Sequence, residues 1–295
     1  MSEKKKEILM GYLFILPALI FFTIFVLYPT INTVKLSFLK WDLLSEPKFV
    51  WFDNYVSIFK DQQLGRIIFN TFILTILSVS IKLSLGLILA YFVFKIKNKY
   101  LSITMEAAIF LPIMLPMSVV SMVFLFLFNT DIGAINGILS LIGIPKLDWL
   151  SGKFLPLVSV LIIDVWKGIG FFFIINLIAI RQIPKSYFDA ASLDGANEYN
   201  KFKSIVIPCI SASSLFLVVN ALITSIQIFD PVYMIMRDGG PGDATTTISY
   251  YIWRTGLHER NIGYGSALAI LLLFIIMGIT LLQFKLSKKW VHYDK

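Results

Sequence analysis

The chain is patterned as long apolar runs separated by shorter polar connections. A helix needs about 20 mostly apolar residues to cross the hydrocarbon core of a bilayer, and several runs are long enough. They cover residues 8–28, 67–94, 103–128, 155–180, 205–229 and 262–284. The pattern therefore predicts an all-α integral membrane protein with about six transmembrane helices.

Two of these runs carry features that affect their interpretation. Pro112 and Pro116 lie inside the third run, and because proline removes backbone hydrogen bonds we predict a kink or a break there. The first run is too long for a signal peptide, and no small-residue cleavage site precedes Tyr28 and Pro29. We therefore predict an N-terminal anchor helix and first external loop over residues 1–66, and a core transmembrane domain over residues 67–295.

The basic residues indicate how the chain is oriented. The two ends and every second connection hold Lys4, Lys5, Lys6, Lys95, Lys97, Lys99, Arg181, Lys185, Lys201, Lys203, Lys285, Lys288, Lys289 and Lys295. The opposite connections are about twice as long in total, yet they hold fewer basic residues. Because short basic segments stay on the cytoplasmic side, both termini are predicted to be cytoplasmic.

Composition narrows the class of protein. Hydrophobic residues make up 57% of the chain and charged residues 15%, which is typical of a membrane protein. Cys209 is the single cysteine and forms no intramolecular disulfide. His258 and His292 are predicted to lie on opposite sides of the membrane, so a catalytic or metal cluster is not expected. The net charge is +8, but no stretch outside the apolar runs interleaves basic and aromatic residues, and we expect no nucleic-acid partner.

The connection between the fourth and fifth runs, residues 181–208, has the composition of two short helices. Ser186 and Asp189 fit a capping box at a helix start, with Pro184 just ahead. Gly195 is suited to end that helix, because glycine adopts the left-handed conformation readily. A second short helix is predicted to begin near Asn197. The result is a helix-turn-helix at the membrane face.

The same connection carries a recognisable motif. Asp189-Ala190-Ala191-Ser192-Leu193-Asp194-Gly195-Ala196, followed by Pro208, resembles the cytoplasmic coupling loop of ABC import permeases, known as the EAA loop. Further stretches similar to carbohydrate importers of the maltose-transporter type are Phe14 to Pro17, Tyr28-Pro29, Asn54-Tyr55, Trp166-Lys167, Gly239 to Pro241 and Gly263 to Ala267. Asp189 stands where the family usually has glutamate, which keeps the charge on a shorter side chain.

The resemblance implies a fold and a set of partners. The fold is that of a type I ABC importer permease with cytoplasmic coupling helices, in the bacterial plasma (inner) membrane. The implied partners are a second homologous permease subunit, an ABC ATPase dimer that docks on the coupling loop, an extracellular solute-binding protein, and a sugar. No cofactor is expected on this chain, because ATP and Mg²⁺ belong to the separate ATPase subunit.

A polar stripe marks the fifth run. Asn220, Thr224 and Gln227 share one helix face because they lie at i, i+4 and i+7. We predict that they line a substrate pathway, with Phe216 and Phe229 able to stack on sugar rings; Asn176 in the fourth run is a weaker candidate. The alternative is that these polar side chains bond neighbouring helices together.

Charged residues inside the runs need partners, because a lone charge in mid-membrane costs about 3 kcal/mol. Asp164 and Lys167 are three residues apart, and we predict a structural ion pair between them. Lys82 and Glu106 lie on different runs, and the sequence does not assign their roles. Gly265 and Ala269 are predicted to allow close approach of the last helix to a neighbour.

Gly239-Gly240-Pro241-Gly242 lacks the lysine and hydroxyl of a phosphate-binding loop. We predict a tight turn there and no ATP site on this chain. The overall prediction is a non-catalytic permease subunit that carries a sugar by alternating access, with an oligosaccharide favoured over a monosaccharide, a polyol or glycerol phosphate. The alternative is a secondary transporter driven by an ion or proton gradient, with Asp164 as a relay.

Overall fold

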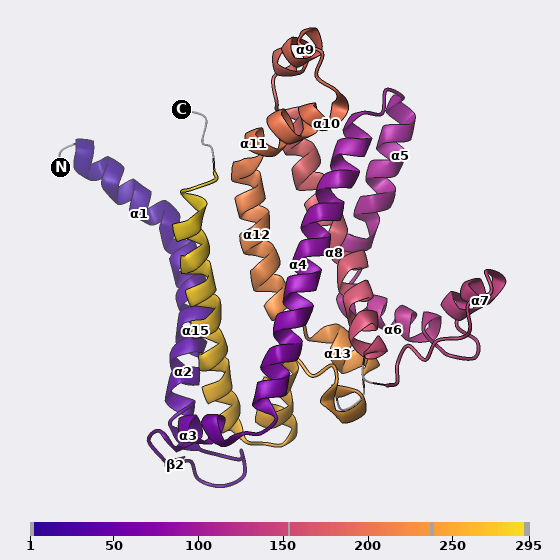
Figure 1. Cartoon of the computed structure of the whole chain (residues 1–295). Helices are drawn as coiled ribbons and strands as arrows, with labels where there is room; N and C mark the ends of the chain where they lie inside the picture. The colour runs from indigo at the N-terminus through magenta and orange to yellow at the C-terminus, as the bar shows by residue number, and fades with distance from the viewer. Residues whose placement is uncertain (1–2, 153, 237–238, 292–295) are drawn as a thin grey trace. The chain divides into compact units, whose positions relative to one another are not determined.

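The computed structural model describes residues 3–152, 154–236 and 239–291 and is helical almost throughout (Figure 1). The elements in chain order are α1 (Glu3–Phe22), η1 (Thr23–Leu27), α2 (Tyr28–Leu36), β1 (Leu39–Lys40), β2 (Lys48–Phe49), α3 (Asp53–Lys60), α4 (Leu64–Phe94), α5 (Lys99–Phe110), η2 (Leu111–Met114), α6 (Met117–Leu127), α7 (Ala134–Leu141), α8 (Leu155–Arg181), α9 (Lys185–Leu193), α10 (Glu198–Lys201), η3 (Phe202–Val206), α11 (Ile207–Cys209), α12 (Ser211–Ile226), α13 (Asp230–Ile235), η5 (Pro241–Asp243), α14 (Ile248–Trp253), η6 (Arg254–His258) and α15 (Ile262–Ser287).

The chain divides into two compact units. Unit 1 comprises Met1–Gln62 with Tyr251–Phe274, and unit 2 comprises Gln63–Tyr250 with Ile275–Lys295. The domain division predicted between residues 66 and 67 stays a prediction.

Five helical segments in the described residues are long and apolar enough to cross a membrane: Met10–Leu36, Leu64–Phe94, Leu155–Arg181, Ser211–Ile235 and Ile262–Ser287. A further pair, Lys99–Met114 and Met117–Leu127, bends by 101° at its break and makes a sixth span if it crosses as one unit. This count confirms the predicted all-α membrane fold with about six spans.

Prolines act differently in the third and the first spans. The break predicted around Pro112 and Pro116 is confirmed, because η2 ends at Met114 and Pro116 caps the start of α6. The first span instead continues past Pro29 to Leu36, eight residues beyond its predicted end. A π-helical turn before the proline, in which Tyr28 N–H bonds to Thr23 C=O, keeps the helix continuous where proline has no amide to donate.

In unit 2 the long helices α4 and α8 lie side by side, with α12 packed against both (Figure 1). A Cβ on Gly86 of α4 would lie 2.6 Å from the Cβ of Phe172 on α8, so glycine allows this close approach. Val79, Phe172, Leu217 and Ala221 form one buried apolar cluster between the three helices.

In unit 1 the segment after α2 folds against the start of α15. Asn54 donates its side-chain amide to the carbonyls of Ser37 and Leu39, at 2.8 and 2.9 Å. A Cβ on Gly265 would lie 2.6 Å from Gly256 Cα, which confirms the close approach predicted for Gly265.

Candidate functional site

The predicted helix-turn-helix is present, with one correction at its start. α9 begins at Lys185, Pro184 is its N-cap residue, and no side chain caps the helix. The capping box assigned to Ser186 and Asp189 is therefore wrong, because Ser186 already lies within the first turn. Proline supplies the extended backbone of an N-cap residue (ψ 131°) without a side-chain acceptor.

The turn itself follows the predicted chemistry. Gly195 has φ +73°, and its N–H bonds to Ser192 C=O while Ala196 N–H bonds to Ala191 C=O at 2.9 Å. This pair of bonds is the Schellman motif that ends a helix. Asn197 then caps α10 by accepting from Asn200 N–H at 2.8 Å, and helical backbone continues through η3 to Cys209.

The second arm of the hairpin is anchored on the end of α4 (Figure 1). Glu198 forms an ion pair with Lys95 and accepts from the Tyr91 hydroxyl at 3.0 Å. Phe202 packs on the Tyr91 ring with centroids 4.9 Å apart. The bond from Lys95, then that from Tyr91, lowers the pKa of Glu198 from 4.5 to about 2. Glu198 was not singled out from the sequence, although it lies in the first turn of a helix, where acidic residues are favoured.

The base of this arm is buried. Val206 and Ile210 belong to an apolar cluster whose other members come from α4 and α8 and are Ala90, Val93, Phe173, Leu177 and Ile180. The second arm is therefore part of the helix bundle, and a displacement of the hairpin would be transmitted to α4, α8 and α12.

The first arm is mostly exposed. Asp189, Ala190, Asp194 and Gly195 are exposed, while Ala191, Ala196 and Pro208 are partly buried. Two large side chains on α9 also point outward, since Tyr187 is 53% and Leu193 is 90% exposed. Phe188 is the residue that ties α9 to α4, with its ring 5.7 Å from that of Phe94. α9 thus presents a surface of small, acidic and apolar groups with no partner among the described residues.

The predicted polar face of α12 is accessible. Thr224 and Gln227 are exposed and Asn220 is half-buried. The Thr224 hydroxyl donates to the carbonyl of Asn220 at 2.9 Å. Within the part of the chain that the structure describes, no interhelical hydrogen bond involves the side chains of these three residues. The geometry therefore leaves them free for a solute, and their role in a pathway stays a prediction.

Aromatic rings flank this face. Phe229, in the break between α12 and α13, stacks on Tyr233 with centroids 5.4 Å apart and an interplanar angle of 14°. Phe216 is 52% exposed. Asn176 lies elsewhere: it is 2% exposed and donates to Phe172 C=O of its own helix at 2.9 Å, so it is not available to a solute in this structure.

The predicted ion pair between Asp164 and Lys167 is wrong. Asp164 Oδ2 lies 2.6 Å from Lys82 Nζ on α4 and accepts from the Ser78 hydroxyl at 2.5 Å. Ser78 in turn lies 3.1 Å from the hydroxyl of Ser225 on α12. Lys167 forms no ion pair within residues 3–152, 154–236 and 239–291.

This network joins α4, α8 and α12 through buried polar groups. Space for the Lys82 side chain comes from Gly168, where a Cβ would lie 2.8 Å from Lys82 Cε. A sequence signal was available, because Ser78 and Lys82 lie at i and i+4 on one face of the second apolar run.

The second unassigned charge, Glu106, does not pair with Lys82. Its carboxylate accepts two bonds from Arg181 at the end of α8, at 2.6 and 3.2 Å, and one from Ser102 at 2.8 Å.

The glycine-rich segment forms the predicted tight turn. Gly239, Gly240 and Gly242 all have positive φ. Arg66 and Asn70 at the start of α4 donate to the carbonyls of Gly242 and Asp243, at 2.9 and 3.0 Å, so the turn is fixed to the bundle.

Comparison with known proteins is consistent with this geometry. A family model described as binding-protein-dependent transport system inner membrane component matches residues 82–292. The probable ABC transporter permease protein YurN of Bacillus subtilis (strain 168) is 31% identical over 94% of this chain and 95% of its own length. The sulfoquinovosyl glycerol transport system permease protein SmoG of Agrobacterium fabrum (strain C58 / ATCC 33970) is 29% identical over 95% of this chain and 91% of that protein.

A solved structure agrees over the same extent. The crystal structure of a bacterial ABC transporter involved in the import of the acidic polysaccharide alginate contains a chain that matches with a TM-score of 0.85 and 25% identity, over 97% of this chain and 98% of that one. The structural match extends over nearly the whole chain, and the family model includes the helical hairpin. The chain therefore belongs to the binding-protein-dependent transport system inner membrane components, the multi-pass permease subunits of ABC importers.

Proposed function

We propose that this chain carries a sugar into the cell as one of two permease subunits of an ATP-driven importer. Family membership supports the importer class, and the relatives named for sulfoquinovosyl glycerol and alginate support a sugar as the solute. The observation that carries the proposal is the hairpin, which exposes α9 while its second arm is built into the bundle.

ATP hydrolysis belongs, in this proposal, to two copies of a separate ATPase subunit. The exposed face of α9, with Asp189, Ala190 and Asp194, fits a groove on such a subunit, because alanines allow close approach and the carboxylates can pair with basic groups. A second homologous permease completes the pathway, and an extracellular solute-binding protein delivers the sugar. Both termini and the hairpin face the cytoplasm, as the distribution of basic residues favours.

Transport proceeds by alternating access without chemistry on this chain. Nucleotide binding to the ATPase favours the outward-open arrangement through the hairpin, and hydrolysis returns the permease to the inward-open arrangement. The nucleotide can shift this equilibrium only as far as its affinities for the two arrangements differ. The polar face with Asn220, Thr224 and Gln227 replaces water around sugar hydroxyls, and the stacked rings of Phe229 and Tyr233 offer an apolar face to a pyranose.

The test exploits the conformation of Gly195. No atom of this chain lies within 4 Å of a Cβ built at this position, so within the chain a substitution acts through the positive φ. Gly195→Val strains the turn, whereas Gly195→Asn is the matched control because asparagine tolerates left-handed backbone. In proteoliposomes with the partner subunits, we expect the valine variant to insert normally and to lose sugar uptake, while the asparagine variant retains most of it.

Two results would contradict the proposal. Normal uptake by Gly195→Val would show that the hairpin does not couple the motor to transport. ATP hydrolysis by the purified chain alone would show that the energy source is not a separate subunit.

A further inference from the structure

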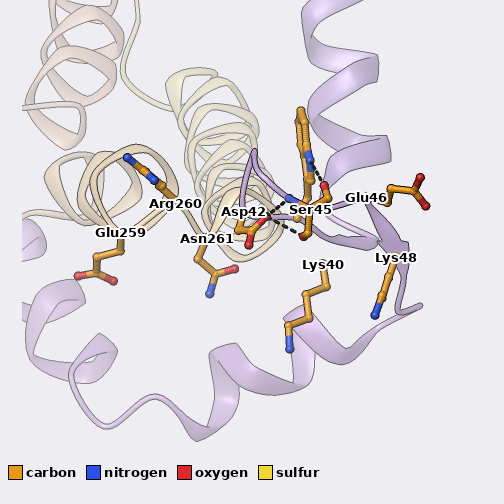
Figure 2. A pocket seen from close by; sticks show the side chains of 9 residues that line it. Lys40, Asp42, Ser45, Glu46, Lys48, Glu259, Arg260 and Asn261 are labelled. Atoms are coloured by element: carbon orange, nitrogen blue, oxygen red, sulfur yellow. Dashed lines mark hydrogen bonds between the residues drawn. The ribbon is translucent and has the colours of Figure 1, made fainter.

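A pocket of about 360 Å³ lies within unit 1 (Figure 2). One wall is the segment around β1 and β2, and the other is the turn that precedes α15. The lining residues are Lys40, Trp41, Asp42, Ser45, Glu46, Lys48, Glu259, Arg260 and Asn261. In the proposed orientation both walls face the outside of the cell.

The two walls are held together rigidly. Ile262 N–H donates to Trp41 C=O at 3.0 Å, and Gly263 lies so close to Leu39 C=O that a Cβ would collide with it. Leu43 and Arg260, one on each wall, adopt positive φ of 68° and 57°. Non-glycine residues hold such backbone only where the surroundings fix it, so the pocket is preformed.

Two of the three carboxylates that line the pocket already have partners within the chain, although both keep their negative charge. Asp42 accepts from Ser45 N–H and the Ser45 hydroxyl, both at 2.7 Å, and from Leu44 N–H at 3.0 Å. Glu259 lies 3.8 Å from Arg254. Among the residues the structure describes, Glu46 is the carboxylate of the pocket without such a partner.

The two lysines of the pocket lack an ion-pair partner among the described residues. Lys40 and Lys48 are directly opposite each other in the β1–β2 ladder, and Figure 2 shows both side chains extending to the same side of this hairpin. Like charges directly opposite are destabilising, and neither lysine forms an ion pair with a described residue. An anion placed between the two ammonium groups would remove this repulsion.

The remaining groups suit a sugar. Trp41 donates its Nε1–H to Ser45 C=O at 3.0 Å. Because the polar group of the ring is satisfied by this bond, the ring offers a flat apolar surface. Asn261 lines the pocket from the opposite wall and supplies an amide for hydroxyl groups. The volume lies at the lower end of the range of small-molecule sites, roughly 300 to 1,000 Å³.

We propose that this pocket binds an acidic saccharide unit of the uronate type, with the carboxylate held between Lys40 and Lys48. The inference rests on the proposed function for the orientation of the pocket and for the class of solute. It adds a binding site on the external surface, separate from the polar face of α12.

The experiment measures binding of galacturonate to the full chain in nanodiscs of uncharged lipid by isothermal titration calorimetry, with galactose as the neutral counterpart. We expect galacturonate to bind, galactose to give no signal, and binding to weaken as ionic strength rises. The double variant Lys40→Gln/Lys48→Gln should lose roughly fivefold in affinity, from two- to threefold per exposed cation. Glu46→Gln should tighten binding about twofold because it removes the unpaired like charge, and Lys60→Gln on α3 is the control with no change.

Several outcomes would overturn the inference. Equal binding of galactose, unchanged affinity of the double lysine variant, or weaker binding by Glu46→Gln would each do so. A different role is indicated if galacturonate does not bind and the assembled transporter with the double lysine variant loses ATPase stimulation by the solute-binding protein. These two results together would overturn the inference and assign the pocket to protein docking. Sugar uptake by the wild-type complex is measured alongside: intact uptake without galacturonate binding overturns this inference alone, whereas absent uptake contradicts the proposed function.

Discussion

Lys82 and Asp164 lie inside two neighbouring membrane-spanning helices and pair with each other. Lys82 and Asp164 have side chains only 4% and 10% exposed, so removal of either leaves an uncompensated charge in apolar surroundings. We expect Lys82→Met to lower the free energy of unfolding by about 3 kcal/mol. Thermal unfolding of the purified chain in detergent measures the loss.

The control for this prediction lies one turn away on α8. Lys167→Met removes a cation that does not pair with Asp164, and we expect a much smaller loss of stability. The double variant Lys82→Met/Asp164→Leu should recover most of the stability of the wild-type chain, because both members of the buried pair are removed together. A loss from Lys167→Met as large as that from Lys82→Met would contradict the pairing.

Substitutions at two glycines of α4 distinguish the effect of helix packing on stability from that of helix propensity. Gly86→Ala introduces a methyl group against the Phe172 side chain and backbone, and we expect it to cost about 1–3 kcal/mol through separation of α4 and α8. Gly65→Ala adds the same methyl group with no atom within 4 Å, so it should stabilise the helix by roughly 0.5–1 kcal/mol. We therefore expect the melting temperature to fall in Gly86→Ala and to rise in Gly65→Ala. An unchanged melting temperature in Gly86→Ala would show that the contact between Gly86 and Phe172 can relax.

At the residue scale the sequence could identify which groups need partners but not which partners they take. Spacing along one helix predicted Asp164 with Lys167, whereas the pairing with Lys82 depends on the rotation and depth of α4 relative to α8. Those quantities follow from close contacts such as Gly86 against Phe172, which no periodicity in the sequence reveals.

At the scale of elements, the hairpin is fixed to the end of α4 by Glu198. We expect Glu198→Gln to remove the ion pair with Lys95 and to increase hydrogen–deuterium exchange of residues 185–209 several-fold, with α4 and α8 unaffected. Glu7→Gln, an exposed acidic residue on α1, is the matched control. Unchanged exchange in the Glu198 variant would indicate that the apolar contacts of Phe188 and Phe202 are sufficient.

The same contact predicts a dependence on pH. The pKa of Glu198 is lowered from 4.5 to about 2, so its contribution to stability is fully present above pH about 4.5 and is lost as the pH falls toward about 2. Exchange of the hairpin amides should therefore rise over this range in the wild-type chain. In Glu198→Gln the rise should be smaller, because the titrating group is absent.

Local rules predicted most of this element. Gly195 as the stop and Asn197 as the second cap follow from side-chain and backbone chemistry within a few residues. The start was misplaced because Pro184 and Ser186 both satisfy rules for a helix beginning, and sequence alone does not rank them. The anchoring by Lys95 and Tyr91 was not predictable, because these residues are about a hundred positions away from Glu198.

At the scale of the whole molecule, the apolar runs predicted the spans closely, but the bent pair α5 to α6 has two interpretations. A bend of 101° suits either a broken helix that crosses the membrane or a re-entrant segment that returns to the side it left. The distribution of basic residues favours a crossing, since it places the segments around Lys99 and Arg181 on the cytoplasmic side.

Accessibility of two positions distinguishes these topologies. Glu46 and Asp194 are separated by α4, the bent pair and α8, so they lie on opposite sides if the pair crosses and on the same side if it is re-entrant. In a Cys209→Ser background, we expect Glu46→Cys to react with a membrane-impermeant maleimide in intact cells and Asp194→Cys to react only after permeabilisation. Both substituted residues are exposed on this chain, and expression without the ATPase subunit keeps Asp194 uncovered, so burial would not explain a lack of labelling. Labelling of both positions from outside would place the hairpin out of reach of a cytoplasmic ATPase, and with it the proposed coupling would fail.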